Sequence, residues 1–135
     1  MTVTTGEIMG WLRAAVGAVL VVSPTAFLRL SSREAPSGVS VLLLRTIGIR
    51  DLVLGAGTVS AARRGGPADA RRWTSAGLAS DSLDVLASLA AGRTIGRRES
   101  AGAAGAALVF AVGDLVALGW GRQPERPTLT RGQAG

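Results

Sequence analysis

The chain has 135 residues, of which 47% are hydrophobic, and a net charge of +6 in which arginine is the only basic residue type. It contains no Cys, His, Lys or Tyr, which excludes thiol, imidazole, Schiff-base and phenol chemistry and leaves only Asp and Glu as general acids or bases. The arginines lie in short clusters between apolar segments without interleaved aromatic residues, so the positive charge does not indicate nucleic acid as a partner.

Four apolar segments follow one another along the chain, at residues 8–30, 40–62, 70–91 and 101–120. Each is close to the roughly 20 residues that a helix needs to cross the hydrocarbon of a bilayer. Glycine, proline and charged residues interrupt the chain between them. The pattern predicts an all-α fold, a bundle of four transmembrane helices in a domain of residues 1–121. A disordered polar tail of residues 122–135 is expected to follow.

A soluble four-helix bundle is the alternative, since the longest uncharged stretches are short enough for a soluble core. Against it, residues 14–28 are apolar nearly all round, whereas a soluble surface helix carries charges on its outer face. We therefore expect a multi-pass protein of the cell membrane with the lipid bilayer as its partner. The loop of residues 63–72 and the tail hold more arginines than the other loops, which favours cytoplasmic termini.

The two halves of the chain resemble each other in two places. Trp11 and Trp73 open the first and third segments, and the triplet Asp-Leu-Val recurs at positions 51–53 and 114–116. This spacing raises the hypothesis of two tandem two-helix hairpins related by an axis along the membrane normal.

Charged residues interrupt the apolar segments close to their centres. A charge at mid-membrane depth costs about 2.5–3.5 kcal/mol on insertion scales, so such side chains usually face a bundle interior and pair there. The residues concerned are Arg13, Arg45, Arg50, Asp51, Asp81, Asp84 and Asp114.

Helical spacing sorts these residues into stripes. The stripes are Gly10, Arg13, Gly17 and Pro24 on the first helix, Gly48, Asp51, Gly55 and Thr58 on the second, and Gly77, Asp81, Asp84 and Ser88 on the third. Glycines in such stripes allow a neighbouring helix to approach closely. Two carboxylates three residues apart repel each other, which favours a retained proton on one of them.

The expected catalytic residues are Asp81, Asp84 and Asp51, with Arg45, Arg50 and Asp114 as ligand-binding residues. Arg13 and Glu7 are expected nearer the membrane interface. No cofactor and no bound metal are predicted.

Residues 45–55, Arg-Thr-Ile-Gly-Ile-Arg-Asp-Leu-Val-Leu-Gly, resemble the R-x-x-G-x-R-D-x-x-L-G signature of small uncharacterised four-helix membrane proteins of bacteria. An acidic pair similar to Asp81 and Asp84 follows on the next helix in that family. The resemblance covers residues 40–91 and implies a four-helix integral membrane fold, but no activity.

Three functions are compatible with these observations. The preferred one is a small integral membrane protein whose buried Asp/Arg site binds a lipophilic small molecule. Isomerisation, cyclisation or epoxide opening are acid–base reactions that carboxylates and an arginine can support. The alternative is a non-enzymatic accessory or assembly subunit, acting as a homo-oligomer or with a larger membrane partner, in which the Asp–Arg pairs only fix helix register. A proton or ion pathway is the third.

Overall fold

The structure, a computed structural model, describes residues 4–31 and 35–120. Within these ranges the chain forms five helices and no strand, which confirms the all-α prediction. The helices are α1 (Thr5–Val22), α2 (Pro24–Ser31), α3 (Gly38–Arg64), α4 (Pro67–Ile95) and α5 (Arg97–Trp120). The predicted polar tail of residues 122–135 lies outside the described residues.

The first predicted segment, residues 8–30, is wrong as a single helix. The chain breaks at Ser23, and α2 begins at Pro24. Proline has no amide hydrogen to donate to the preceding turn and its ring clashes with that turn, so it is tolerated at the start of a helix and breaks one in its interior. The same rule places Pro67 at the start of α4.

Side-chain caps define two other helix starts. The Thr4 hydroxyl accepts a hydrogen bond from the Glu7 amide at 3.2 Å, and the Ser37 hydroxyl accepts one from the Ser40 amide at 3.1 Å. Each satisfies an amide that has no partner inside its helix. Between α4 and α5 the chain turns at Gly96, whose φ of 94° is open to glycine at no steric cost.

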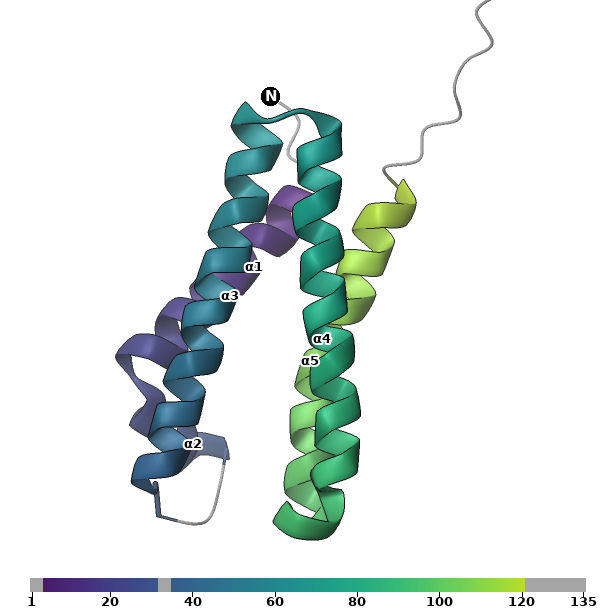
Figure 1. Ribbon diagram of the computed structural model, residues 1–135. Coiled ribbons are helices and arrows are strands. Elements are labelled where there is room, and N and C mark those ends of the chain that lie inside the picture. The colour runs from purple at the N-terminus through teal and green to yellow at the C-terminus, as the bar shows by residue number, and fades with distance from the viewer. Residues whose placement is uncertain (1–3, 32–34, 121–135) are drawn as a thin grey trace, which may run out of the picture.

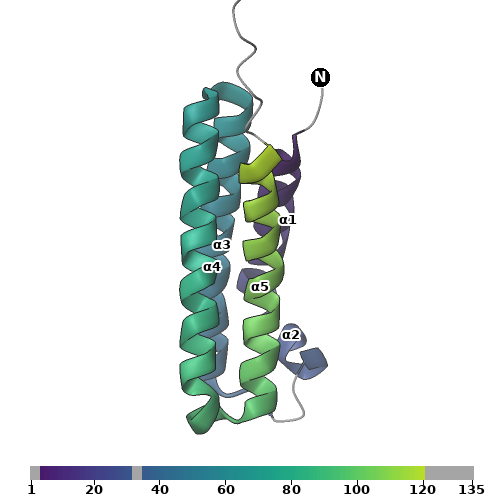
Figure 2. The same cartoon turned by 90° about the vertical axis from the view of Figure 1, so that its right-hand side faces the viewer.

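The four long helices lie side by side, and each runs opposite to the one before it, while the short α2 lies at the end of the bundle remote from the start of α1 (Figures 1 and 2). The helices pack as two pairs, α1 with α3 and α4 with α5, and contacts between the pairs are fewer. The start of α1, the α3–α4 turn and the end of α5 lie at the same end of the bundle (Figure 1). This pairing is the one expected for two hairpins, although it does not test a duplication.

Glycines set the distance between α1 and α3. A Cβ atom at Gly17 would lie 2.5 Å from the Leu52 amide nitrogen, and one at Gly55 would lie 2.5 Å from both the Ala14 amide nitrogen and the Gly10 carbonyl oxygen. The two backbones are therefore in direct contact, as the glycine stripes predict.

The polarity of the bundle is the reverse of that of a soluble protein. The buried apolar side chains of the described residues are Leu20, Val59, Ala61 and Ala111. Eight polar or charged residues are equally buried, whereas 24 large apolar side chains are exposed. Exposed apolar surface of this extent indicates contact with another apolar phase or partner.

Two helices of the described chain are long and apolar enough to cross a membrane, at Thr5–Val22 and Ser100–Gly119. α3 and α4 carry more charge along their length. Length and composition therefore account for two of the four predicted spans.

The glycine contact can be tested with two single substitutions. We expect Gly55→Ala to destabilise the fold by about 1–3 kcal/mol, since the added methyl overlaps the α1 backbone. The matched change Gly105→Ala, on a part of α5 where a Cβ atom meets nothing within 4 Å, should be neutral or stabilise by up to about 1 kcal/mol through helix propensity. Thermal unfolding followed by circular dichroism measures both, and equal effects of the two changes would contradict the close α1–α3 packing.

Candidate functional site

The guanidinium of Arg13 stands at the centre of the bundle and contacts carboxylates from three other helices. It donates to Asp81 on α4 through both terminal nitrogens, at 3.1 and 2.5 Å, and to Asp114 on α5 at 2.8 Å. Asp51 on α3 lies 3.6 Å from the same guanidinium. One side chain of α1 thus links all four long helices through charge-assisted contacts.

A second guanidinium, that of Arg50, extends this cluster towards the surface. Its Nε and one terminal nitrogen donate to Asp51 at 3.2 and 2.9 Å, and its other terminal nitrogen lies 2.6 Å from a carboxylate oxygen of Asp84 on α4. Arg13, Arg50 and these four aspartates are called the Arg/Asp network below.

The network is buried at one end and accessible at the other. Arg13, Asp51, Asp81 and Asp114 are at most 5% exposed, whereas the side chains of Arg50 and Asp84 are 31% and 36% exposed. Every buried side-chain nitrogen or oxygen of the described residues has a hydrogen-bond partner. Full pairing is what allows charged groups to persist inside a protein, because an unpaired buried charge is very costly.

The backbone positions explain how the network is built. Asp51 is the central residue of α3 and Asp81 that of α4, by their residue ranges. Gly77 leaves room for the contact between α4 and α5, since a Cβ atom there would lie 2.5 Å from a carboxylate oxygen of Asp114. The ring of Phe110 lies 4.9 Å from the Arg13 guanidinium carbon and covers it on one side.

The structure brings together five of the six residues that the sequence singles out. Asp51, Asp81, Asp84, Asp114 and Arg50 all belong to the network. The sixth, Arg45, is exposed on α3 and has no ion pair with any described residue. It is placed six residues before Asp51, about 120° away around the helix, so it points to a different side.

The prediction that Arg13 lies near the interface is wrong, because its guanidinium is the centre of the network. The signal was present in the sequence: Arg13 shares a stripe with Gly10 and Gly17, the two glycines that pack against α3. A residue on such a stripe faces the neighbouring helices rather than lipid or water. Glu7, in the first turn of α1, pairs with Arg63 at 2.6 Å.

Asp81 and Asp84 do not form the mutually repelling carboxylate pair that their spacing suggests. Asp81 binds Arg13 inside the bundle and Asp84 binds Arg50 at its edge, so each carboxylate has its own positive partner. No three acidic side chains of the described chain are arranged to hold a metal ion. The arrangement is therefore that of an ionic joint between helices, with Asp84 as its most accessible carboxylate.

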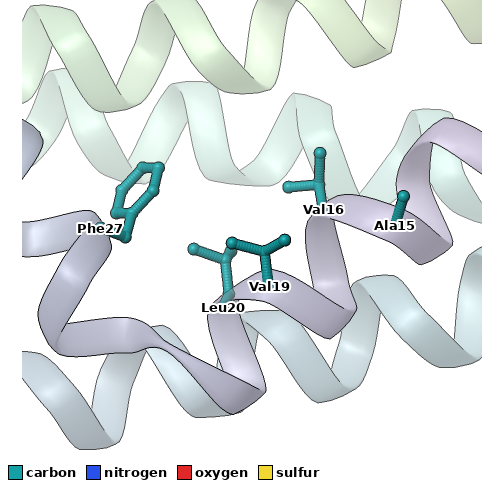
Figure 3. A pocket seen from close by; sticks show the side chains of 5 residues that line it. All are labelled: Ala15, Val16, Val19, Leu20 and Phe27. Carbon is teal, nitrogen blue, oxygen red and sulfur yellow. The ribbon is translucent and has the colours of Figure 1, made fainter.

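An apolar groove lies further along α1 than Arg13, where α1 meets α2. Its volume is about 230 Å³, and it is lined by Ala15, Val16, Val19, Leu20 and Phe27 (Figure 3). Val16 and Val19 are exposed there, whereas Arg13 faces the interior of the bundle. No residue of the network lines the groove.

No protein-family model, no curated protein and no solved structure matches this chain. The resemblance of residues 45–55 to the family of small bacterial membrane proteins thus stays a prediction.

The role of Arg13 can be tested by neutralising it. Arg13→Gln leaves three buried aspartates without their shared guanidinium, and we expect a loss of about 3–5 kcal/mol in the free energy of unfolding. Arg45→Gln, an exposed arginine of the same bundle, should change it by less than about 0.5 kcal/mol. Adding Asp81→Asn and Asp114→Asn to Arg13→Gln should recover part of the loss. If Arg13→Gln unfolds at the same denaturant concentration as Arg45→Gln, the ionic joint is not required.

Proposed function

We propose that the chain is a multi-pass membrane protein in which α1, α3, α4 and α5 all cross the bilayer, with the start of α1 and the end of α5 in the cytoplasm. The observation that carries the proposal is the reversed polarity, with charge in the centre and large apolar side chains outside. In lipid this arrangement is favourable, because the exposed side chains meet hydrocarbon and the charges meet each other.

Helix lengths support four crossings in spite of the charge on α3 and α4. α3 has 27 residues and α4 has 29, which correspond to lengths of about 40 Å and 43 Å. The hydrocarbon core is about 30 Å thick, so both helices are long enough to cross it. Their central charges, Asp51 and Asp81, face the network rather than the exposed surface, and burial in protein is the condition under which mid-membrane charges are tolerated.

The number of crossings can be measured with single cysteines, since the chain has no cysteine of its own. We expect Gly66→Cys in the α3–α4 turn and Thr94→Cys near the α4–α5 turn to react with a membrane-impermeant maleimide from opposite sides of the membrane. If only α1 and α5 cross, both positions must react from the same side. Labelling of intact and lysed cells distinguishes the two topologies, and retention in the membrane after a carbonate wash tests integration itself.

We propose further that the protein binds a lipophilic small molecule, and that the apolar groove at α1 and α2 is the binding site. The groove has room for part of a hydrocarbon chain and is lined by apolar side chains (Figure 3). Two of the three predicted catalytic aspartates, Asp51 and Asp81, are buried against guanidinium groups, as is Asp114, which was predicted to bind a ligand. The network then holds the helices that carry the groove, which is a positioning role.

Acid–base chemistry, if the protein performs it, is best assigned to Asp84. Its side chain is 36% exposed, and Arg50 beside it can orient a ligand or stabilise a developing negative charge. A non-enzymatic subunit would have the same ionic joint but would need neither an open groove nor an accessible carboxylate.

Groove binding can be tested with a diazirine-labelled fatty acid as the probe. We expect photo-crosslinks to map to residues 15–27, and Val19→Trp, which fills the groove, to lower the crosslinking yield about tenfold. Leu43→Trp adds the same side chain on an exposed part of α3 and should leave the yield unchanged. Equal labelling of all three proteins would reject the groove as a ligand site and leave the accessory-subunit alternative.

A further inference from the structure

The corner between α3 and α4 concentrates arginine and tryptophan at one end of the bundle. Arg63 and Arg64 end α3, and Arg71 and Arg72 lie in the first two turns of α4. Trp73 lies in the second turn of α4, and the guanidinium carbon of Arg63 lies 5.4 Å from the ring centroid of Trp11. Tryptophan and arginine together are typical of the boundary between hydrocarbon and lipid headgroups.

Part of the positive charge at this corner is not neutralised by the described residues. Glu7 pairs with Arg63, and Asp69 lies 3.6 Å from Arg72 with both side chains more than half exposed. An exposed pair of this kind contributes little and leaves the arginine open to other anions. Neither Arg64 nor Arg71 has an ion pair with a carboxylate of the described chain.

On the proposed membrane arrangement, these arginines lie near the edge of the hydrocarbon, from which their long side chains reach the lipid phosphates. Arg72 is nine residues from Asp81 at the centre of α4, and Arg63 is twelve from Asp51 at the centre of α3. At 1.5 Å per residue these separations are about 14 Å and 18 Å, against a half-thickness of about 15 Å for the hydrocarbon.

An apolar depression adjoins the charge. It measures about 260 Å³ and is lined by Arg72, Trp73 and Ala76. The indole of Trp73 lies against α3 at Gly57, where a Cβ atom would overlap the ring, and the residue is 36% exposed. A guanidinium at the edge of the hydrocarbon, beside an apolar recess, can contact both the phosphate and the acyl chain of a phospholipid.

We infer that this corner binds the phosphate of an anionic phospholipid through Arg71 and Arg72, with the first part of an acyl chain in the depression beside Trp73. The inference rests on the proposed membrane location. It assigns a lipid site distinct from the groove at α1 and α2, because the two sites share no residue. A bound anionic lipid would neutralise the corner and brace α4 against α3.

The test is a titration of the full chain in detergent micelles with phosphatidylglycerol, followed by native mass spectrometry and by the midpoint of thermal unfolding. We expect saturable binding to the wild type that raises the midpoint, whereas phosphatidylcholine with the same chains and inorganic phosphate alone do neither. The double change Arg71→Gln with Arg72→Gln should weaken phosphatidylglycerol binding about 30-fold, since each arginine contributes roughly a factor of five.

Two further variants separate charge from shape. Arg93→Gln with Arg97→Gln removes two exposed arginines from the opposite end and should leave binding unchanged. Ala76→Phe fills the depression without altering charge and should weaken binding. Equal binding by both double variants, equal stabilisation by phosphatidylcholine, or full stabilisation by inorganic phosphate would each overturn the inference. Carbonate extraction and cysteine labelling test the membrane topology independently of the titration, so a failed titration rejects the lipid site without rejecting the topology.

Discussion

Contact between the Arg13 guanidinium and three aspartates is the interaction on which the bundle depends. Each aspartate comes from a different helix, and Arg13 supplies the fourth. Since α1–α3 and α4–α5 pack as separate pairs with fewer contacts between them, the ionic contacts carry much of the connection between the pairs. A charge in this position is tolerated because every donor and acceptor around it is paired.

Within the α1–α3 pair a different force operates. Glycines bring the backbones of α1 and α3 into contact, so dispersion between main chains replaces the interlocking of large side chains. Large apolar side chains are therefore not needed between these helices and lie on the outer surface, so few apolar side chains are buried. Direct backbone packing within this pair and charge between the pairs together give a bundle without a conventional hydrophobic core.

The Arg/Asp network, the apolar groove and the arginine-rich corner lie in different parts of the bundle. The network fills the centre and leaves no free carboxylate there, the apolar groove lies further along α1, and the arginine-rich corner lies at the opposite end of the bundle. The two proposed ligands would occupy separate places, a lipophilic molecule in the groove and an anionic headgroup at the corner. Asp84 and Arg50 are the part of the network that a polar group can reach.

Residue periodicity by itself determined the helical class, the approximate location of the long helices and the inward stripes of Asp51 and Asp81, because a buried charge on an apolar helix leaves a clear pattern. The break before Pro24 also has a cause in the sequence, because proline disrupts a helix interior, although hydropathy alone predicts one continuous segment. The exclusion of Arg45 follows from its angle around α3, so closer use of the helical period would have found it.

Only the tertiary structure decided which charges pair. Asp81 and Asp84 are neighbours along one helix, yet they bind different guanidiniums. Asp81 binds Arg13 of α1, whereas Asp84 binds Arg50 of α3. The central role of Arg13 likewise depends on the packing of its glycine stripe against α3, which places one long side chain within reach of two further helices. A stripe in the sequence specifies the direction of a side chain, whereas its partner depends on which helices pack together and at what distance.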